Sequence, residues 1–417
     1  MLQYLVPITI FSLTIVTLSV IVLIARNRLT ERKRVTVTVN GKQTMKIDTG
    51  VTLLETLALQ NIELPAACGG RGLCGQCRLQ VHPLEALSPT ESNHINRRDA
   101  SEGVRLACMY QVRHSLDVTI PQTLLRAHRF ECTVVSNRNV STYLKQLILK
   151  VPEDESFTFR AGDYVVVEAP PGEYPLAAAH IDQAYEREWQ RLNLGALTAQ
   201  IQDRTGRAYS LANPPSTNKE LMLIVRLATP PAGTGALPGE VSSYIFSLKP
   251  GDSVMVSGPF GDFHAIGNDG LVADEMKYKE MVLIGGGVGI APLRSIILDE
   301  LANKQFSGPI SLWYGARNAR EVCFFEEFST LAEEYANFSY HVALSEPETE
   351  ESWRGPIGFI HNVVYEQHLA HSPNPERAEY YLCGPPLMSA ATLAMLEDIG
   401  VDRAHIHFDD FGGANAD

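Results

Sequence analysis

The feature that most constrains this chain is a glycine-rich loop holding three cysteines, Cys68, Cys74 and Cys77, with Cys108 further along. Four thiolates can hold the two irons of a 2Fe-2S cluster, and glycines allow the positive φ angles that bring loop amides close to the sulfurs. A zinc site and a disulfide pair are the alternatives. Zinc sites commonly use two short Cys-x-x-Cys pairs, whereas this chain has one such pair and a distant single cysteine. The pattern therefore predicts a 2Fe-2S cluster with these four cysteines as metal ligands.

Length and composition set limits on the rest. A chain of 417 residues is longer than one hydrophobic core needs, so several domains are expected. The net charge of −13 argues against nucleic acid as a partner. The chain has seven cysteines, an odd number, and four of them are assigned to the cluster. This cysteine usage suits a reducing compartment. Cys132 and Cys323 are interpreted as buried apolar residues.

The N-terminal stretch from Met1 to Ala25 contains no charged side chain. As a helix rising about 1.5 Å per residue, it can cross the roughly 30 Å hydrocarbon core of a bilayer. A removed signal peptide is the alternative, but the basic start and small-residue cleavage site of such peptides are missing. Basic residues concentrate in the segment 26–34 instead. By the positive-inside rule, residues 1–25 are predicted to be a single transmembrane anchor with the N-terminus outside and the bulk of the chain in the cytoplasm.

Residues 34–125 are predicted to form a small mixed α+β domain. Residues 35–39 alternate as a strand before an Asn40-Gly41 turn, and Thr52 to Leu59 has helical spacing with a capping box at its start. Further strands are expected at 78–81 and 116–120, and a helix from about residue 88. With the approach to Cys108, this block resembles a β-grasp-like plant-type ferredoxin domain. Five residues separate Cys68 from Cys74, one more than the plant-type spacing.

Residues 126–275 show dense strand and turn signals, at 130–135, 143–150, 162–169, 221–227 and 251–258, which predict an antiparallel β-barrel. The string from Arg207 to Asn213 contains an arginine that can hold a diphosphate, a tyrosine that can stack on a flat ring, and a serine that can hydrogen-bond a ring nitrogen. A solvated strand face would look similar. The string from Gly239 to Tyr244 is a glycine turn opening a helix, whose amides can bind phosphate.

Residues 276–417 are predicted to be a doubly wound α/β domain with a parallel sheet. A buried strand at 281–284 leads into a glycine loop, Gly285 to Pro292, and then a helix at 293–301, which is the phosphate-binding arrangement of dinucleotide domains. Pro292 replaces the last glycine of G-x-G-x-x-G. Alternating strands and helices follow, at 310–314, 325–335, 338–344, 362–367, 379–383 and 388–396. The strand 379–383 delivers Cys383-Gly384-Pro385 at its carboxyl end, where such folds bind ligands.

These motifs, in this order, resemble the ferredoxin-NADP reductase superfamily. The resemblance implies FAD and NADH as cofactors. It implies that Ser210 contacts the isoalloxazine with Tyr209, and that Cys383 lies beside the nicotinamide; a buried small apolar residue is the alternative for Cys383. The implied FAD-binding residues are Arg207, Tyr209, Ser210, Asn213, Gly239, Val241, Ser242 and Ser243. The implied nucleotide-binding residues are Gly285, Gly286, Gly287, Gly289, Pro292, Cys383, Gly384 and Pro385.

The whole chain resembles the F subunits of bacterial sodium-translocating NADH:quinone oxidoreductases, including the insertion from Gly172 to Thr205 and the tail after Phe408. The resemblance implies a single-pass protein of the bacterial inner membrane, with a periplasmic N-terminus. It implies an NADH dehydrogenase that passes electrons through FAD and the 2Fe-2S cluster to membrane subunits and quinone, while the complex exports sodium. Phe411 is the first candidate for the aromatic residue that stacks on the flavin, and Phe408 is the second. Phe411 is also expected to be a catalytic residue, together with Ser210 and Cys383.

Three questions stay open at this stage. The chain could instead be an anchored reductase component that feeds an oxygenase, or a non-catalytic assembly subunit. The apolar stripe of the insertion could cover the barrel or dock membrane partners; its residues are Tyr185, Trp189, Leu192 and Leu194. NADH is expected over NADPH, although Arg317 or Arg320 could receive a 2′-phosphate.

Overall fold

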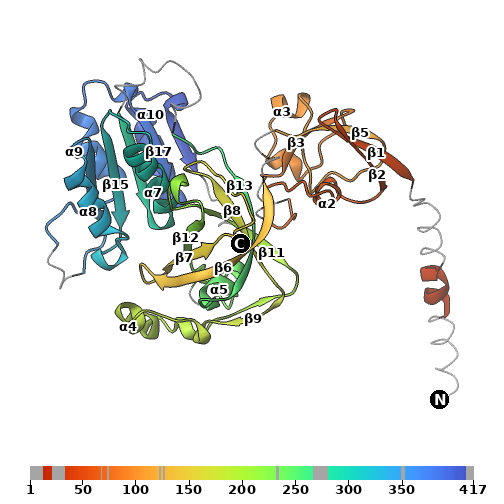
Figure 1. Ribbon diagram of the computed structural model, residues 1–417, viewed down its shortest axis with the longest axis horizontal. Helices are drawn as coiled ribbons and strands as arrows, with labels where there is room; N and C mark the ends of the chain where they lie inside the picture. Colours follow the sequence, from red (N-terminus) through yellow and green to blue (C-terminus); the bar gives the residue numbers. More distant parts are fainter. Residues whose placement is uncertain are drawn as a thin grey trace. The chain divides into compact units, whose positions relative to one another are not determined.

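The structure is a computed structural model that describes residues 13–20, 33–66, 68–72, 75–121, 124, 127–231, 234–265, 280–348 and 353–409 (Figure 1). Two compact units make up the chain, residues 1–60 with 77–120, and residues 61–76 with 121–417. Residues 13–20 are helical, and among the described residues no helix is long and apolar enough to cross a membrane. The rest of the predicted anchor, like Cys74 and Phe411, lies outside the described residues.

The first unit contains a five-stranded mixed sheet in the order β2-β1-β5-β3-β4. β1 pairs antiparallel with β2 across the Asn40-Gly41 turn, where both residues have positive φ, and parallel with β5. The strands are β1 Arg34–Val39, β2 Gln43–Asp48, β3 Arg78–His82, β4 Val104–Leu106 and β5 Leu116–Thr119. The mixed sheet is confirmed; β4, only three residues long, was not predicted.

Local hydrogen bonds explain the helices of this unit. The predicted capping box starts α2 Leu53–Ala58, because the Glu55 amide donates to the Thr52 hydroxyl at 3.2 Å and the Thr52 amide donates to the Glu55 carboxylate at 3.3 Å. The helix predicted from residue 88 is only the 3₁₀ turn η1 Glu91–Asn93, with α3 Arg97–Ser101 behind it. The buried Glu91 carboxylate accepts bonds from the Ser88 and Leu106 amides, which fixes a turn there instead of a longer helix.

The second unit contains a six-stranded antiparallel half-barrel in the order β11-β8-β13-β6-β7-β12. A backbone bridge between Leu211 and Leu223 joins the two edges of this sheet. Alternate residues such as Leu147, Leu149 and Val165 point inward and are fully buried. The elements are β6 His128–Asn139, β7 Leu144–Lys150, β8 Tyr164–Ala169, β11 Thr205–Ser210, β12 Glu220–Arg226, α5 Glu240–Ser247 and β13 Ser253–Phe260.

The insertion forms a hairpin, β9 Gly172–Pro175 with β10 Thr198–Ile201, and the helix α4 Gln183–Arg191. Trp189 and Leu194 are each 5% exposed in the half-barrel core, and Tyr185 and Leu192 pack against that core. Trp189 stacks on Phe246 of α5 with ring centroids 5.9 Å apart. The apolar stripe therefore covers the barrel, which confirms the first of the two interpretations.

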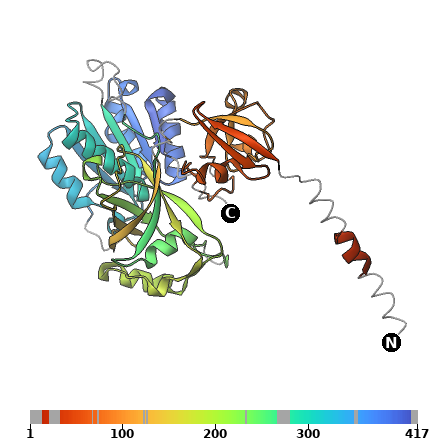
Figure 2. The same ribbon diagram turned by 45° about the vertical axis from the view of Figure 1, so that its right-hand side comes forward.

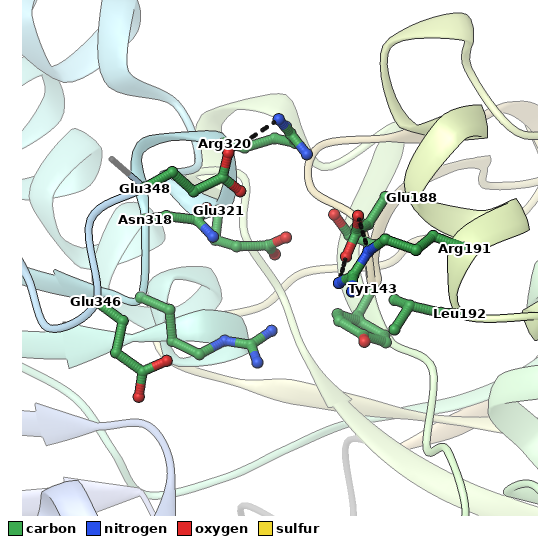
Figure 3. Close-up of a pocket in the computed structure, with 11 residues that line it drawn as sticks. Tyr143, Glu188, Arg191, Leu192, Asn318, Arg320, Glu321, Glu346 and Glu348 are labelled. Carbon is green, nitrogen blue, oxygen red and sulfur yellow. Dashed lines mark hydrogen bonds and ion pairs between the residues drawn. The ribbon is translucent and has the colours of Figure 1, made fainter. Parts of the chain in front are cut away.

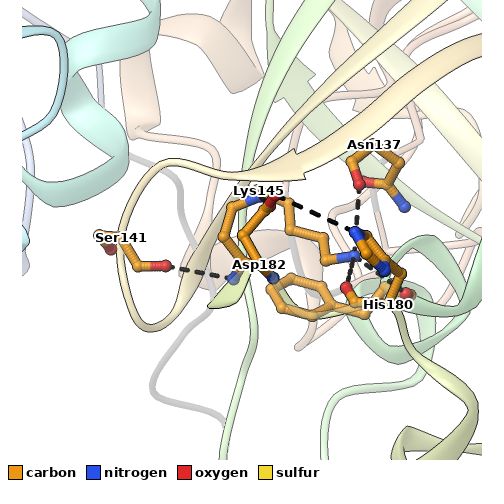
Figure 4. A network of polar contacts seen from close by, with 7 residues as sticks. Asn137, Ser141, Lys145, His180 and Asp182 are labelled. Atoms are coloured by element: carbon orange, nitrogen blue, oxygen red, sulfur yellow. Dashed lines mark hydrogen bonds and ion pairs between the residues drawn. The ribbon is translucent and has the colours of Figure 1, made fainter. Parts of the chain in front are cut away.

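A buried lysine ties the insertion to the half-barrel (Figure 4). The Lys145 ammonium of β7 donates to the backbone carbonyls of His180 at 2.7 Å, Phe246 at 3.4 Å and Asn137 at 3.5 Å. Its side chain is 0% exposed, and this burial lowers the pKa of Lys145 from 10.5 to about 8, although the nearby Asp182 carboxylate opposes the shift.

A five-stranded parallel sheet follows, in the order β16-β15-β14-β17-β18. One hydrophobic cluster packs α7 and α8 around Leu283 and Leu312; another packs α9 and α10 around Ile284 and Trp313. Helices thus cover both faces of the sheet (Figures 1 and 2), which confirms the doubly wound domain. Its elements are β14 Met281–Gly286, α7 Ile290–Leu298, β15 Ile310–Ala316, α8 Phe325–Glu334, β16 Phe338–Leu344, α9 Ile360–Gln367, β17 Glu379–Cys383, α10 Pro386–Asp398 and the unpredicted β18 Ile406–Asp409.

Candidate functional site

A cleft of about 1710 Å³ in the second unit gathers predicted residues from the half-barrel and from the parallel-sheet domain. Half-barrel residues and carboxyl-end loops of the sheet lie together there, where doubly wound sheets bind ligands. The predicted flavin- and nucleotide-binding residues that line it are Arg207, Tyr209, Ser210, Gly239, Gly286, Gly287, Gly384 and Pro385. The cleft therefore joins the expected flavin and nucleotide motifs in one cavity.

At the half-barrel side, β11 presents Arg207, Tyr209 and Ser210 to the cleft. The Ser210 hydroxyl, 4% exposed, donates to the Asp409 carboxylate at 3.1 Å. Burial raises the pKa of the Tyr209 phenol well above its usual value, so the ring stays neutral. Asp409 ends β18 and was not predicted, because the phenylalanines of this tail indicated a segment that stacks on the flavin and not a strand. Phe408 is 53% exposed on that strand.

The turn before α5 supplies backbone to the cleft rather than hydroxyl groups. Gly239 is the N-cap of α5, and the Ser242 hydroxyl donates to its carbonyl at 3.1 Å and accepts from the Ala228 amide at 3.2 Å. Val241 and Ser243 are buried on the barrel side. A Cβ on Gly239 would stand 2.6 Å from the Ala228 Cβ, so the turn needs glycine. Of the predicted residues in this string, only Gly239 lines the cleft.

The glycine loop between β14 and α7 contains two kinds of glycine. Gly286 and Gly287 line the cleft, and Gly287 has φ +55° with open space where a Cβ would stand. Gly285 and Gly289 serve packing instead, since a Cβ on Gly289 would lie 1.9 Å from the Cys383 carbonyl oxygen. Pro292 is buried within α7. The two cleft-lining glycines and the start of α7 allow the close backbone approach that a dinucleotide pyrophosphate requires.

Two predicted residues have side chains turned away from the cleft. Cys383 is 0% exposed in the core that α7 and α8 share, which matches the alternative of a small buried residue; its proposed place beside the nicotinamide stays a prediction. The Asn213 amide donates to the Glu220 carbonyl at 2.8 Å and accepts from the Met222 amide at 2.9 Å. The Asn213 carbonyl also accepts from Ser295 of α7 at 2.7 Å, so Asn213 fixes the half-barrel to the sheet domain.

The cluster cysteines are described in part. The Cys77 and Cys108 sulfurs lie 3.2 Å apart and are buried, as two ligands of one iron would be. Cys68 is also buried, and the loop glycines at 69, 70, 72 and 75 all have positive φ, as predicted. Among the described residues no group of three His, Cys, Asp or Glu is placed to hold a metal, and Cys74 lies outside them. The buried thiols and the glycine backbone fit a 2Fe-2S cluster.

Models of three protein families match the chain in order. A 2Fe-2S iron-sulfur cluster binding domain matches residues 37–113, an oxidoreductase FAD-binding domain matches 189–265, and an oxidoreductase NAD-binding domain matches 283–393. These matches, together with the cleft and the thiol pair, support FAD, a 2Fe-2S cluster and a nicotinamide dinucleotide as the cofactors.

Relatives cover nearly the whole chain. The F subunit of the Na(+)-translocating NADH-quinone reductase of Neisseria meningitidis is 43% identical over 97% of this chain and 98% of its own, and that of Klebsiella pneumoniae is 44% identical over the same shares. Among solved structures, the Amycolatopsis cytochrome P450 reductase GcoB is similar, with a TM-score of 0.65 and 26% identity over 91% of this chain and all of its own. The ferredoxin reductase of carbazole 1,9a-dioxygenase, 23% identical with a TM-score of 0.58 over 91% of this chain and 99% of its own, shares the fold. Because relatives that are 43% and 44% identical cover nearly the whole chain, the chain belongs to the family of F subunits of Na(+)-translocating NADH-quinone reductases.

Proposed function

We propose that this chain is the NADH-oxidising, electron-input subunit of a membrane NADH:quinone oxidoreductase that exports sodium. The observation that carries the proposal is the single cleft in which Arg207, Tyr209 and Ser210 meet the Gly286-Gly287 loop. One cavity that presents a flavin motif and a dinucleotide loop can hold a hydride donor against its acceptor. Sodium movement belongs to the other, membrane-embedded subunits with which this chain would assemble.

The chain's own residues bind and orient the reactants. Arg207 is assigned to the FAD diphosphate, Tyr209 to the flavin ring, and the backbone amides of Gly286 and Gly287 to the dinucleotide pyrophosphate. The Asp409 carboxylate, as acceptor of the Ser210 hydroxyl at 3.1 Å, holds that hydroxyl in one orientation within the cleft. When bound, FAD supplies the conversion of a two-electron hydride donor into single electrons, which a 2Fe-2S cluster can carry.

Four thiolates are assigned to the cluster: Cys68, Cys74, Cys77 and Cys108. Burial of Cys77 and Cys108 keeps water from the sulfurs, and the positive-φ glycines let loop amides approach them. Held by these thiolates, a 2Fe-2S cluster would supply one-electron transfer between the flavin and an acceptor in the membrane subunits.

The N-terminal residues 1–25 would anchor the chain in the bacterial inner membrane, with the N-terminus in the periplasm and the remainder in the cytoplasm. In support, the helical residues 13–20 expose Leu13, Val16 and Leu18 at 70, 58 and 57%. Exposed aliphatic side chains of this density favour a lipid environment over water. Uncharged sequence before Arg26 and basic residues after it favour this orientation.

The order of electron flow is tested with Cys74→Ala in the assembled complex. NADH oxidation by a soluble acceptor that takes electrons from flavin should persist, whereas quinone reduction should be lost, because the cluster lies between the two. Cys132→Ala, which removes a buried thiol of the half-barrel core, should retain both activities. An equal loss of both activities in Cys74→Ala, with FAD still bound, would contradict the proposal.

An anchored reductase that feeds an oxygenase is the second candidate, and the similarity to the Amycolatopsis cytochrome P450 reductase favours it. The two candidates differ in the electron acceptor. Quinone reduction by membrane vesicles that contain the chain, abolished when its gene is deleted, would support the quinone reductase. A purified chain without flavin or cluster absorbance would instead indicate an assembly subunit.

A further inference from the structure

A second cavity, of about 300 Å³, adjoins the cleft, since Tyr143, Arg317 and Glu321 line both. Charged side chains from three parts of the second unit surround it (Figure 3). We call it the charged pocket, and its charged residues are Glu188 and Arg191 of α4, Arg317, Arg320 and Glu321 after β15, and Glu346 and Glu348 after β16. The inserted helix α4 thus contributes one wall of a cavity that adjoins the cleft.

The position of the charged pocket relates it to the dinucleotide. β14 carries the glycine loop, and β15 is its parallel neighbour, with Gly286 paired to Gly315. In doubly wound domains the adenosine ribose lies beyond the strand next to the glycine loop, where an acidic residue binds the 2′-hydroxyl or an arginine accepts a 2′-phosphate. Arg317 directly follows β15, so the charged pocket lies where the 2′ substituent is read.

Two of the three arginines of the charged pocket already have acidic partners, and the third, Arg317, lies over the Tyr143 ring with its guanidinium carbon 5.7 Å from the ring centroid. Arg191 forms an ion pair with Glu188, and the Arg320 guanidinium lies 3.4 Å from the Glu348 carboxylate. The hydrogen bond from Arg191, with Arg320 and Arg317 close by, lowers the pKa of Glu188 and keeps it ionised. Three guanidinium groups face four carboxylates, which leaves a net negative charge. A dianionic phosphate would have to displace a carboxylate to use Arg191 or Arg320, and it would face the other carboxylates of the pocket at any of the three arginines.

We propose that the charged pocket selects NADH against NADPH, with Glu348 occupying the Arg320 guanidinium and Glu188 the Arg191 guanidinium that a 2′-phosphate would otherwise use. The two glutamates act as specificity-determining residues. A ribose with a free 2′-hydroxyl needs no guanidinium and leaves both ion pairs intact. The inference rests on the proposed function, because it assumes that NADH binds in the cleft.

The test measures kcat/KM for NADH and NADPH with a soluble acceptor in the full-length protein carrying Glu348→Gln, Glu188→Gln or both. Each change should raise the NADPH-to-NADH ratio of kcat/KM about tenfold, the size of one charge-assisted hydrogen bond. Adding Arg320→Ala to Glu348→Gln should remove the gain, because the freed guanidinium is its source. Calorimetry measures binding independently of catalysis. The affinity for adenosine 2′,5′-bisphosphate relative to AMP should rank the variants in the same order as the kinetic ratio does.

Glu397→Gln is the matched control, because Glu397 forms an exposed ion pair with Arg403 outside both cavities. The NADPH-to-NADH ratio of kcat/KM should stay unchanged in this variant. If one of the two glutamate variants fails to bind FAD, the other still provides the test. A wild-type protein that oxidises neither nucleotide would overturn the proposed function. A wild-type protein that oxidises NADH, with an unchanged ratio in both glutamate variants, would overturn only this inference.

Discussion

Replacement of the buried Lys145 by methionine tests how an ionised group is held inside the half-barrel. Burial lowers the pKa of Lys145 from 10.5 to about 8, and at about 1.36 kcal/mol per pKa unit this corresponds to about 3 kcal/mol. Below pH 8 the ammonium is charged in the folded and the unfolded protein. Between pH 8 and 10.5 the folded protein loses this proton while the unfolded chain keeps it, so Lys145 makes the folded state more stable as the pH rises.

The wild-type protein should therefore gain up to about 3 kcal/mol of stability, relative to Lys145→Met, as the pH rises from 7 to 10.5. At pH 7 the variant should still be the less stable protein, because three backbone carbonyls that accept from Lys145 lose their donor. The assay is urea unfolding of the full-length holoprotein, followed by flavin fluorescence at several pH values. Taking the difference between the two proteins removes the titration of other groups.

Lys150→Met provides the matched control, because Lys150 lies on the same strand with its side chain 57% exposed. Its stability should follow the wild-type pH profile. Parallel profiles for the wild type and Lys145→Met between pH 8 and 10.5 would refute the reasoning, since the buried lysine would then titrate as it does in the unfolded chain.

Three further changes test the site and its supports. Ser210→Ala removes the hydroxyl that donates to Asp409, and should lower kcat for NADH oxidation about tenfold or more while FAD stays bound. Gly289→Ala places a Cβ 1.9 Å from a backbone carbonyl, and should lower the Tm by several degrees and raise KM for NADH. Glu379→Gln leaves one of two histidines on the β18 side without its carboxylate acceptor, and should cost about 1–3 kcal/mol in unfolding experiments.

Each of these has an outcome that counts against it. An unchanged kcat in Ser210→Ala would show that the hydroxyl has no part in the rate-limiting step. Gly287→Ala is the control for the glycine loop, because open space surrounds its Cβ position and only its φ of +55° strains an alanine, by about 1–2 kcal/mol. It should destabilise less than Gly289→Ala, whose Cβ meets a backbone carbonyl, and the reverse order would contradict the packing argument. A Tm for Glu379→Gln equal to that of the wild type would mean that the histidine bonds contribute nothing to stability.

Periodic and local features were readable from sequence because they depend on near neighbours in the chain. The buried run at 281–284 and the alternating strands of the half-barrel identified both folds, and Thr52 with Glu55 identified the start of α2. Some elements were not predicted, or were predicted to be longer than they are, because their formation depends on residues far away in the chain. β18 is a strand because β17 pairs with it, and the turn at Glu91 ends early because its carboxylate reaches Leu106.

The sequence by itself determined which chemical groups this protein brings to a flavin and a dinucleotide, since Arg207, Tyr209, Ser210 and the glycine loop are short motifs with local geometry. Only the tertiary structure decided how each group is used. It separated the cleft-lining glycines, Gly286 and Gly287, from Gly289, which packs against a carbonyl, and it added Asp409 from the far end of the chain. The physical reason is that burial, ion pairing and close backbone approach are set by residues far apart in sequence, which no local pattern encodes.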